Sequence, residues 1–201
     1  MSAFLSAKND GFSISPISDA VMARMEGKSF GKDCTTRRED LRYLTVLHYD
    51  HTGKVQKGEL VCNKSIAQDL IEIFEALYEA KYPIERMVLI DEYDGDDEAS
   101  MRANNTSSFN FRKVTGKNSL SKHAYGRAID INPFYNPYVH TRNGKQSVEP
   151  EGSKPWATNR TKARNKMVIT ADDLCLKLFK QHGFKWGGDW KTMKDYQHFE
   201  K

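Results

Sequence analysis

The chain has 201 residues, 38% of them hydrophobic and 11% aromatic, so it can bury one sizeable core and is most simply a single domain spanning 1–201. Its 31 basic and 27 acidic side chains give a net charge of +4, which is too mild and too mixed to indicate nucleic-acid binding. No apolar run approaches the roughly 20 residues that cross a bilayer. The three cysteines lack the CxxC spacing of a thiolate zinc cluster and indicate no disulfide framework.

Residues 1–40 contain no recognisable motif, and we treat them as an N-terminal extension of unassigned role. Residues 41–49 and 58–62 are β-rich and flank a glycine-containing turn, which predicts a hairpin. Residues 65–81 repeat apolar side chains at three- and four-residue steps, which predicts an amphipathic helix that opens with a capping box of Ser65 and Gln68.

Residues 87–90, MVLI, are predicted to form a short buried strand. The acidic stretch DEYDGDDEAS follows it. We interpret this stretch as a solvated, flexible loop, because it lacks the residue order of a calcium-binding loop.

Alternation returns at residues 128–132, where Ala128 and Asp130 share one face of a predicted strand. Residues 133–166 are polar and proline-rich, and they are predicted to form a surface excursion of the kind that often serves as a binding loop. Residues 171–182 are predicted as a helix with Thr170 as N-cap. Because regular βαβ alternation is missing, the fold class predicted is α+β.

Three side chains supply the ligand set that zinc uses in hydrolases: His123, Asp130 and His198. Such sites have three protein ligands from His, Asp or Glu and one open position. Asp195 precedes His198 by three residues, close enough to act as a general base without being a ligand. Gly126 permits the turn that brings His123 back toward Asp130. The other histidines lack partners at ligand spacing and are predicted to be structural or solvated.

The runs SKHAYGRAIDIN and WGGDWKTMKDYQHFE resemble the two signature segments of the M15 zinc peptidases, S-x-H-x-x-G-x-A-x-D and W-G-G-D-W-x(4)-D-x-x-H-F. The resemblance places the peptidase motifs within residues 100–201. It implies that His123, Asp130 and His198 hold one zinc ion per chain and that Asp195 is the catalytic base. It also implies a Hedgehog/D,D-peptidase-like fold, an antiparallel sheet with helices packed against it and zinc in an open groove.

The resemblance identifies Arg112, in FNFR, as the arginine that binds the carbonyl of the scissile bond. A fixed cation beside the metal would stabilise a tetrahedral oxyanion. Arg102 carries the same charge nearby in the sequence, and it stays open as an alternative.

Several side chains near the motifs allow two interpretations. Ser121 either binds substrate or caps a turn, and the resemblance favours substrate. Trp186 and Trp190 either line the cleft or pack its floor, and we expect Trp190 to contact substrate. Asp189 either orients a metal-binding imidazole or closes the Gly-Gly turn.

The family includes D-Ala-D-Ala carboxypeptidases and L-Ala-D-Glu endopeptidases, so the leading hypothesis is a zinc metallopeptidase that hydrolyses a bond in peptidoglycan stem peptides. An aspartate as base favours the endopeptidase branch slightly. The alternative is a non-catalytic zinc-containing module that binds cell-wall peptides, although such a module has no need of Asp195. A structural zinc site is disfavoured because only three ligands are present.

The substrate determines the expected partners and location. Peptidoglycan peptides are the expected partners, with no nucleic acid and no membrane span, and a monomer is favoured. Because peptidoglycan lies outside the cytoplasm, we expect an extracytoplasmic protein, periplasmic or at the cell surface, whose signal is absent from the given sequence.

Overall fold

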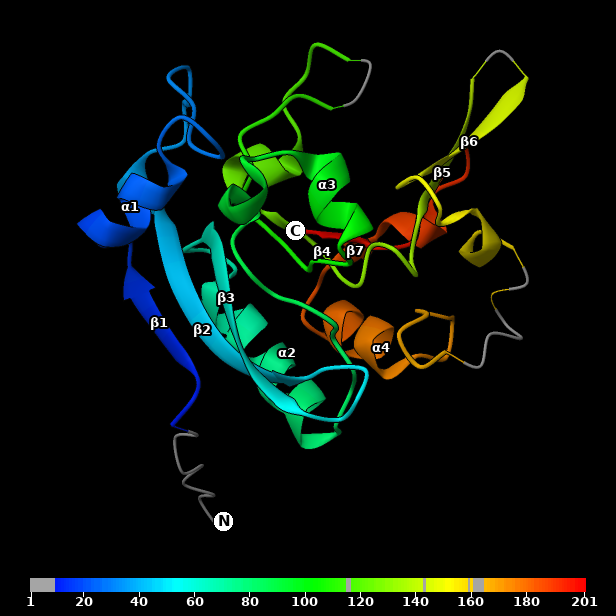
Figure 1. Cartoon of the computed structure of the whole chain (residues 1–201), viewed down its shortest axis with the longest axis horizontal. Coiled ribbons are helices and arrows are strands. Elements are labelled where there is room, and N and C mark those ends of the chain that lie inside the picture. The colour runs from blue at the N-terminus through cyan, green and yellow to red at the C-terminus, as the bar shows by residue number, and fades with distance from the viewer. Residues whose placement is uncertain (1–9, 115–116, 143, 159, 161–164) are drawn as a thin grey trace.

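The computed structural model describes residues 10–114, 117–142, 144–158, 160 and 165–201. Residues 1–9 of the predicted extension and residues 143, 159 and 161–164 of the predicted excursion therefore lie outside the described residues. The described part combines short helices with three small antiparallel sheets, whose strand orders are β1-β2-β3, β4-β9-β7 and β6-β5-β8 (Figure 1). At this coarse level the fold is the mixed α and β arrangement that the sequence predicts.

The first sheet contains β1 (Ser13–Pro16), β2 (Leu41–Tyr49) and β3 (Val55–Asn63). β2 and β3 form the predicted hairpin, and β1 pairs with the other edge of β2. The helix α1 (Asp19–Met25) and the 3-10 turn η1 (Arg38–Asp40) lie between β1 and β2 in the chain. The segment before β2 thus contributes a strand to a sheet.

The helix α2 (Ala67–Glu79) packs against β2 and confirms the predicted amphipathic helix. Its predicted capping box is wrong. The helix begins after Ile66 without a side-chain cap, and the amide of Gln68 donates to Glu72 instead. The backbone N–H of Ser65 donates to the side chain of Asn63 at 3.0 Å, so this local turn replaces the box.

The predicted strand at residues 87–90 does not form. The Met87 carbonyl accepts from the Glu59 N–H at 2.9 Å, and the backbone of Val88 bonds to the side chain of Asn105, but these contacts build no strand. The chain then turns into η2 (Ile90–Tyr93) and α3 (Asp97–Arg102).

The prediction of a flexible acidic loop is also wrong, because acidic side chains here stabilise the turns. Asp96 caps α3 by accepting from the Ala99 N–H, and buried Asp91 accepts from the Ser29 N–H.

The second sheet contains β4 (Ala128–Asp130), β7 (Lys185–Trp186) and β9 (His198–Glu200). Both faces of β4 are buried. Two 3-10 turns, η3 (Lys122–Tyr125) and η6 (Gly187–Asp189), lie beside this sheet. The helix α4 (Leu174–Gln181) starts later than predicted, because Asp173 rather than Thr170 caps it by accepting from the Cys175 N–H.

The predicted surface excursion contains a hairpin, β5 (Tyr138–Arg142) and β6 (Lys145–Glu149), followed by η4 (Lys154–Trp156). β5 also pairs with β8 (Lys194–Asp195), which completes the third sheet. The segment is held to the body by Arg160. Its guanidinium donates to the Asn136 side chain at 2.6 Å and lies 4.0 Å from the centre of the Tyr196 ring.

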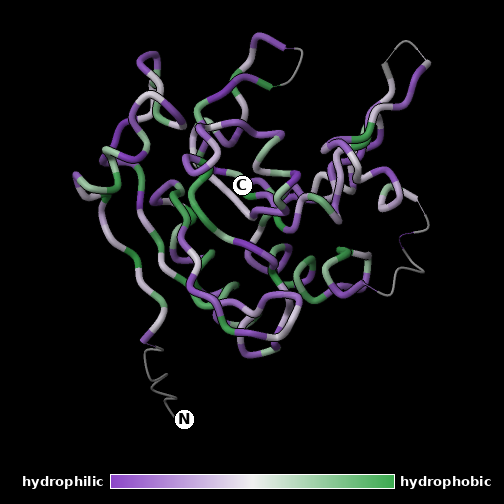
Figure 2. Tube along the Cα trace, in the orientation of Figure 1, coloured by the Kyte–Doolittle hydropathy of each residue, from purple (hydrophilic) through white to green (hydrophobic). Residues whose placement is uncertain are grey.

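The main core lies between the first sheet, α2 and α4, and it continues under the second sheet. Hydrophobic stretches follow β3 and the helices behind it, whereas the loop tips are mostly hydrophilic (Figure 2). Phe179 of α4 stacks on Phe199 of β9 with 4.2 Å between the ring centres, and both side chains are fully buried. Among the described residues, no helix has the length and apolar character needed to cross a membrane.

Gly126 is predicted to contribute strongly to the stability of the fold. Its φ is +64°, and a Cβ added there would lie 2.7 Å from the backbone nitrogen of Asn63. We expect Gly126→Ala to lower the free energy of unfolding by roughly 3 kcal/mol, since backbone strain of about 1–2 kcal/mol adds to a steric clash. Urea denaturation measures the change.

Gly53→Ala is the matched control. Its φ is +80°, and no described atom lies within 4 Å of the added Cβ, so only the strain applies. Equal losses in the two variants would contradict the importance of the close approach.

Candidate active site

The pairing of β4 with β9 brings the first two candidate ligands together. In this antiparallel pair Asp130 lies directly opposite His198, so their side chains project to the same face. Nδ1 of His198 is 3.1 Å from Oδ1 of Asp130.

The third candidate, His123, comes from the turn η3. Ser121 caps this turn by accepting from the His123 N–H at 3.3 Å, and Gly126 ends it in a left-handed conformation. As a result, Nε2 of His123 lies 3.1 Å from Nδ1 of His198 and 3.2 Å from Oδ2 of Asp130.

The three side chains could hold a metal ion. One ligand atom from each lies within 4.8 Å of the other two, and all three residues are buried. The two imidazole nitrogens are 3.1 Å apart, close to the roughly 3.4 Å that separates ligands around a tetrahedral ion with bonds of about 2.1 Å, and each nitrogen lies beside a different oxygen of Asp130. The geometry therefore fits the metal set that the sequence predicts.

Two outer contacts fix which imidazole nitrogen faces the centre. Nδ1 of His123 donates to the Ser108 carbonyl at 2.6 Å, and Nε2 of His198 lies 3.2 Å from a carboxylate oxygen of Glu200. Both contacts leave the opposite nitrogen free for an ion. Sequence reasoning missed both partners, although Glu200, two residues after His198 in a strand, has the spacing of a side chain on the same face.

Asp189 does not orient an imidazole. Its side chain is exposed and forms an ion pair with Lys180 at 2.8 Å. The interpretation of Asp189 as a side chain that orients a metal-binding imidazole is therefore wrong. Glu200 contacts the imidazole of His198 instead.

The electrostatics of the group favour a positive charge at its centre. Burial opposes ionisation of Asp130, but the two histidines outweigh burial and hold the pKa of this carboxyl well below its usual range. Burial also disfavours the imidazolium of His198, yet its bonds to Asp130 and Glu200 raise its pKa to about 10. Either a proton or a metal ion satisfies these carboxylates, and the two compete for the same nitrogen.

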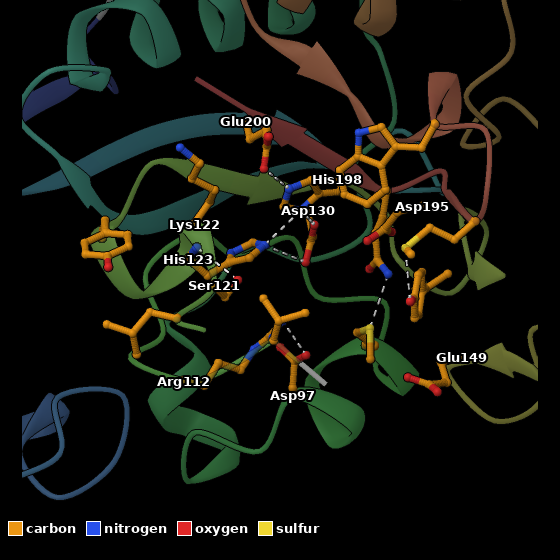
Figure 3. A pocket seen from close by; sticks show the side chains of 18 residues that line it. Asp97, Arg112, Ser121, Lys122, His123, Asp130, Glu149, Asp195, His198 and Glu200 are labelled. Atoms are coloured by element: carbon orange, nitrogen blue, oxygen red, sulfur yellow. Dashed lines mark hydrogen bonds and ion pairs between the residues drawn. The ribbon is translucent and has the colours of Figure 1, made fainter. Parts of the chain in front are cut away.

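A cavity of about 230 Å³ opens beside the group, and it contains most of the predicted site residues (Figure 3). Arg112, Ser121, Trp190 and Asp195 all line it together with the three candidate ligands. Trp186 instead packs in the core and donates its indole N–H to the Tyr196 carbonyl.

Asp195 ends β8 at the edge of the cavity. Its Oδ1 is buried and has no hydrogen-bond partner among the described residues. Burial raises the pKa of this carboxyl to about 7, although the neighbouring histidines oppose the rise. A carboxylate with this pKa and a free oxygen is suited to exchanging protons near neutral pH.

The two candidate arginines occupy different surroundings. Arg112 lines the cavity, where its Nη2 lies 2.7 Å from Asp97 and its buried Nε has no partner among the described residues. Arg102 is more exposed and pairs with Glu151 at 3.2 Å. The geometry therefore places Arg112, not Arg102, at the site, and Asp97 is a partner that sequence reasoning missed.

The remaining histidines contact acceptors outside the candidate metal group. Nδ1 of His48 lies 2.7 Å from the Ile84 carbonyl and is buried, whereas the other three lie beside carboxylates. These pairs are His51–Glu85, His140–Glu149 and His182–Asp69.

Removal of Glu200 is predicted to weaken metal binding. Glu200→Ala should lower the affinity for Zn²⁺ by about 10- to 100-fold, because the His198 ring loses the carboxylate that orients it. Competition with a chromophoric chelator measures the affinity. Asp189→Ala is the control and should bind Zn²⁺ like the unaltered protein. A reversal of the two results would return the orienting role to Asp189.

Comparison with known proteins agrees with this geometry. Residues 115–201 match the Peptidase_M15_4 family model, described as D-alanyl-D-alanine carboxypeptidase, and the match includes the three candidate ligands and Asp195. No solved structure matches the chain. This C-terminal segment therefore resembles the M15 peptidases.

Proposed function

We propose that the protein is a zinc-dependent peptidase that hydrolyses a peptide bond in peptidoglycan stem peptides. The observation that carries the proposal is the position of Asp195, whose buried, unpartnered oxygen lines the same cavity as the buried His–Asp–His group. The family match supports peptide hydrolysis. Because peptidoglycan lies outside the cytoplasm, the proposal includes an extracytoplasmic location.

His123, Asp130 and His198 would hold the zinc ion, since their buried nitrogen and oxygen atoms have the donor types and spacing that zinc prefers. When bound, zinc supplies Lewis acidity, which polarises a carbonyl and makes water more acidic. The Ser108 carbonyl and Glu200 keep the two imidazoles in the required orientation.

Asp195 and Arg112 would perform the remaining steps. Asp195 accepts the proton of the attacking water and returns it to the leaving amine. The guanidinium of Arg112, held by Asp97, donates to the oxyanion of the tetrahedral intermediate. Its unpartnered Nε is a donor that no described side chain uses.

Two bonds of the stem peptide are candidates for cleavage. The family description favours a carboxypeptidase, whereas an aspartate base favours an endopeptidase. Lys122 lines the cavity and could pair with a terminal carboxylate, which supports the carboxypeptidase. Mass spectrometry of a digested stem pentapeptide distinguishes them, because loss of the terminal alanine and release of the first alanine give different products.

The non-catalytic module is the second candidate function. The same cavity would then hold a wall peptide without cleaving it. Such a module would have no use for Asp195 as a proton acceptor, so the Asp195 variant separates the two functions.

Asp195→Asn is expected to lower kcat by roughly 100- to 10,000-fold, because the amide keeps the shape but cannot accept the proton. Zinc content should stay near one ion per chain. Turnover of a stem peptide and elemental analysis measure the two quantities. His123→Ala is the comparison and should lose both metal and activity. Full turnover by Asp195→Asn would exclude Asp195 as the base.

Arg112→Ala is expected to lower kcat on the order of a hundredfold with little change in zinc content, because the oxyanion loses a fixed donor. Steady-state kinetics on the same peptide measure it. Arg102→Ala, which alters an exposed ion pair outside the cavity, should behave like the unaltered protein. The opposite pattern would transfer the oxyanion role to Arg102.

A further inference from the structure

One wall of the cavity is a row of side chains across the third sheet. Tyr138 of β5 lies opposite Glu149 of β6 and also opposite Asp195 of β8. Residues directly opposite one another project to the same face of a sheet, and all three of these line the cavity. Neighbouring strands lie about 4.8 Å apart. Because β6 and β8 flank β5, the backbones of Glu149 and Asp195 are separated by roughly 10 Å.

Glu149 offers a free carboxylate oxygen at the far end of this row. Its Oε1 lies 3.1 Å from Nε2 of His140, but no described residue bonds its Oε2. The side chain is 32% exposed and faces the cavity. It therefore can accept a further hydrogen bond from a ligand.

Charge is distributed unevenly along the cavity. The two cations Lys122 and Arg112 lie on one side of the His–Asp–His group together with Glu200 and Asp97, whereas Glu149 and Asp195 lie on the other (Figure 3). A ligand that spans the cavity would meet acceptors of hydrogen bonds on the Glu149 side. Opposite charges steer and orient a bound ligand.

A second observation indicates a ligand with N–H donors in the same cavity. Gln197 lines the cavity two residues after Asp195, and its side chain is only 2% exposed. Its amide oxygen is buried and has no partner among the described residues, while its nitrogen lies 3.3 Å from the Met101 sulfur. A buried acceptor of this kind is normally satisfied, so a ligand N–H would complete the site.

We propose that Glu149 is a specificity residue that binds a side-chain ammonium of the substrate, one residue away from the cleaved bond. The inference rests on the proposed function. The substrates would be peptides that contain a diamino acid with a free amine. The backbones of Glu149 and Asp195 are roughly 10 Å apart, so a substrate with one backbone step of about 3.5 Å and an extended four-carbon side chain of roughly 6 Å can reach from one strand to the other. The Tyr138 ring between them packs against the methylene groups.

Two stem pentapeptides test the proposal, one with L-lysine at the third position and the other with its Nε-acetyl derivative. The lysine lies one residue from either candidate bond, so the test does not depend on which is cleaved. The unaltered protein should cleave the free-amine peptide with a kcat/KM about tenfold higher, mainly through a lower KM, as expected for one charged hydrogen bond.

Glu149→Gln should remove this preference by weakening only the reaction of the free-amine peptide, and Glu149→Lys should reverse it. Glu151→Gln is the matched control, because Glu151 pairs with Arg102 outside the cavity, and it should keep the preference. Thermal melting and zinc content verify that each variant is folded and loaded.

Equal cleavage of the two peptides by the unaltered protein would overturn the inference while leaving the proposed function intact. A preference that persists in both Glu149 variants would overturn it in the same way. If the unaltered protein cleaves neither peptide, the proposed function itself fails, and the inference fails with it.

Discussion

The site depends on the register between β4 and β9. Alternation along β9 directs His198 and Glu200 toward the cavity and Phe199 into the core, where it stacks on Phe179. A slip of one residue would exchange the two faces, burying the imidazole among apolar side chains and exposing the phenyl ring. The hydrophobic core therefore fixes the distance between the candidate ligands, although it contributes no atom to them.

The same arrangement gathers several carboxylates in one place, and their negative charge must be balanced in the folded protein. Asp130, Glu200 and Asp195 surround two imidazoles in a largely buried space. Burial of unpaired charge is costly, so the folded group requires a cation at its centre. An ion that binds only the folded group would therefore stabilise the fold.

The sequence predicted the parts of the site that depend on residue type and spacing. His123, Asp130, His198 and Asp195 come together, because the two motifs form one turn and paired strands. The hairpin at residues 41–63 and the helix at 67–79 followed from periodicity.

What the sequence could not reveal depends on tertiary contacts. Asp97 lies in an acidic stretch that resembles a solvated loop, and only the folded chain pairs it with Arg112. The Ser108 contact to His123 uses a backbone carbonyl, which no residue type reveals. Residues 87–90 have the composition of a strand, but local turns follow at once. Glu149 faces the cavity only because β5 pairs on both edges.

The β5–β6 hairpin projects from the body of the molecule, away from the core helices (Figure 1). It joins the site through the pairing of β5 with β8, and Arg160 anchors the segment that follows. The hairpin can therefore accumulate substitutions or change length without moving the candidate ligands. Related chains could diverge in substrate choice through this segment alone, and an engineer could graft a hairpin from one onto another.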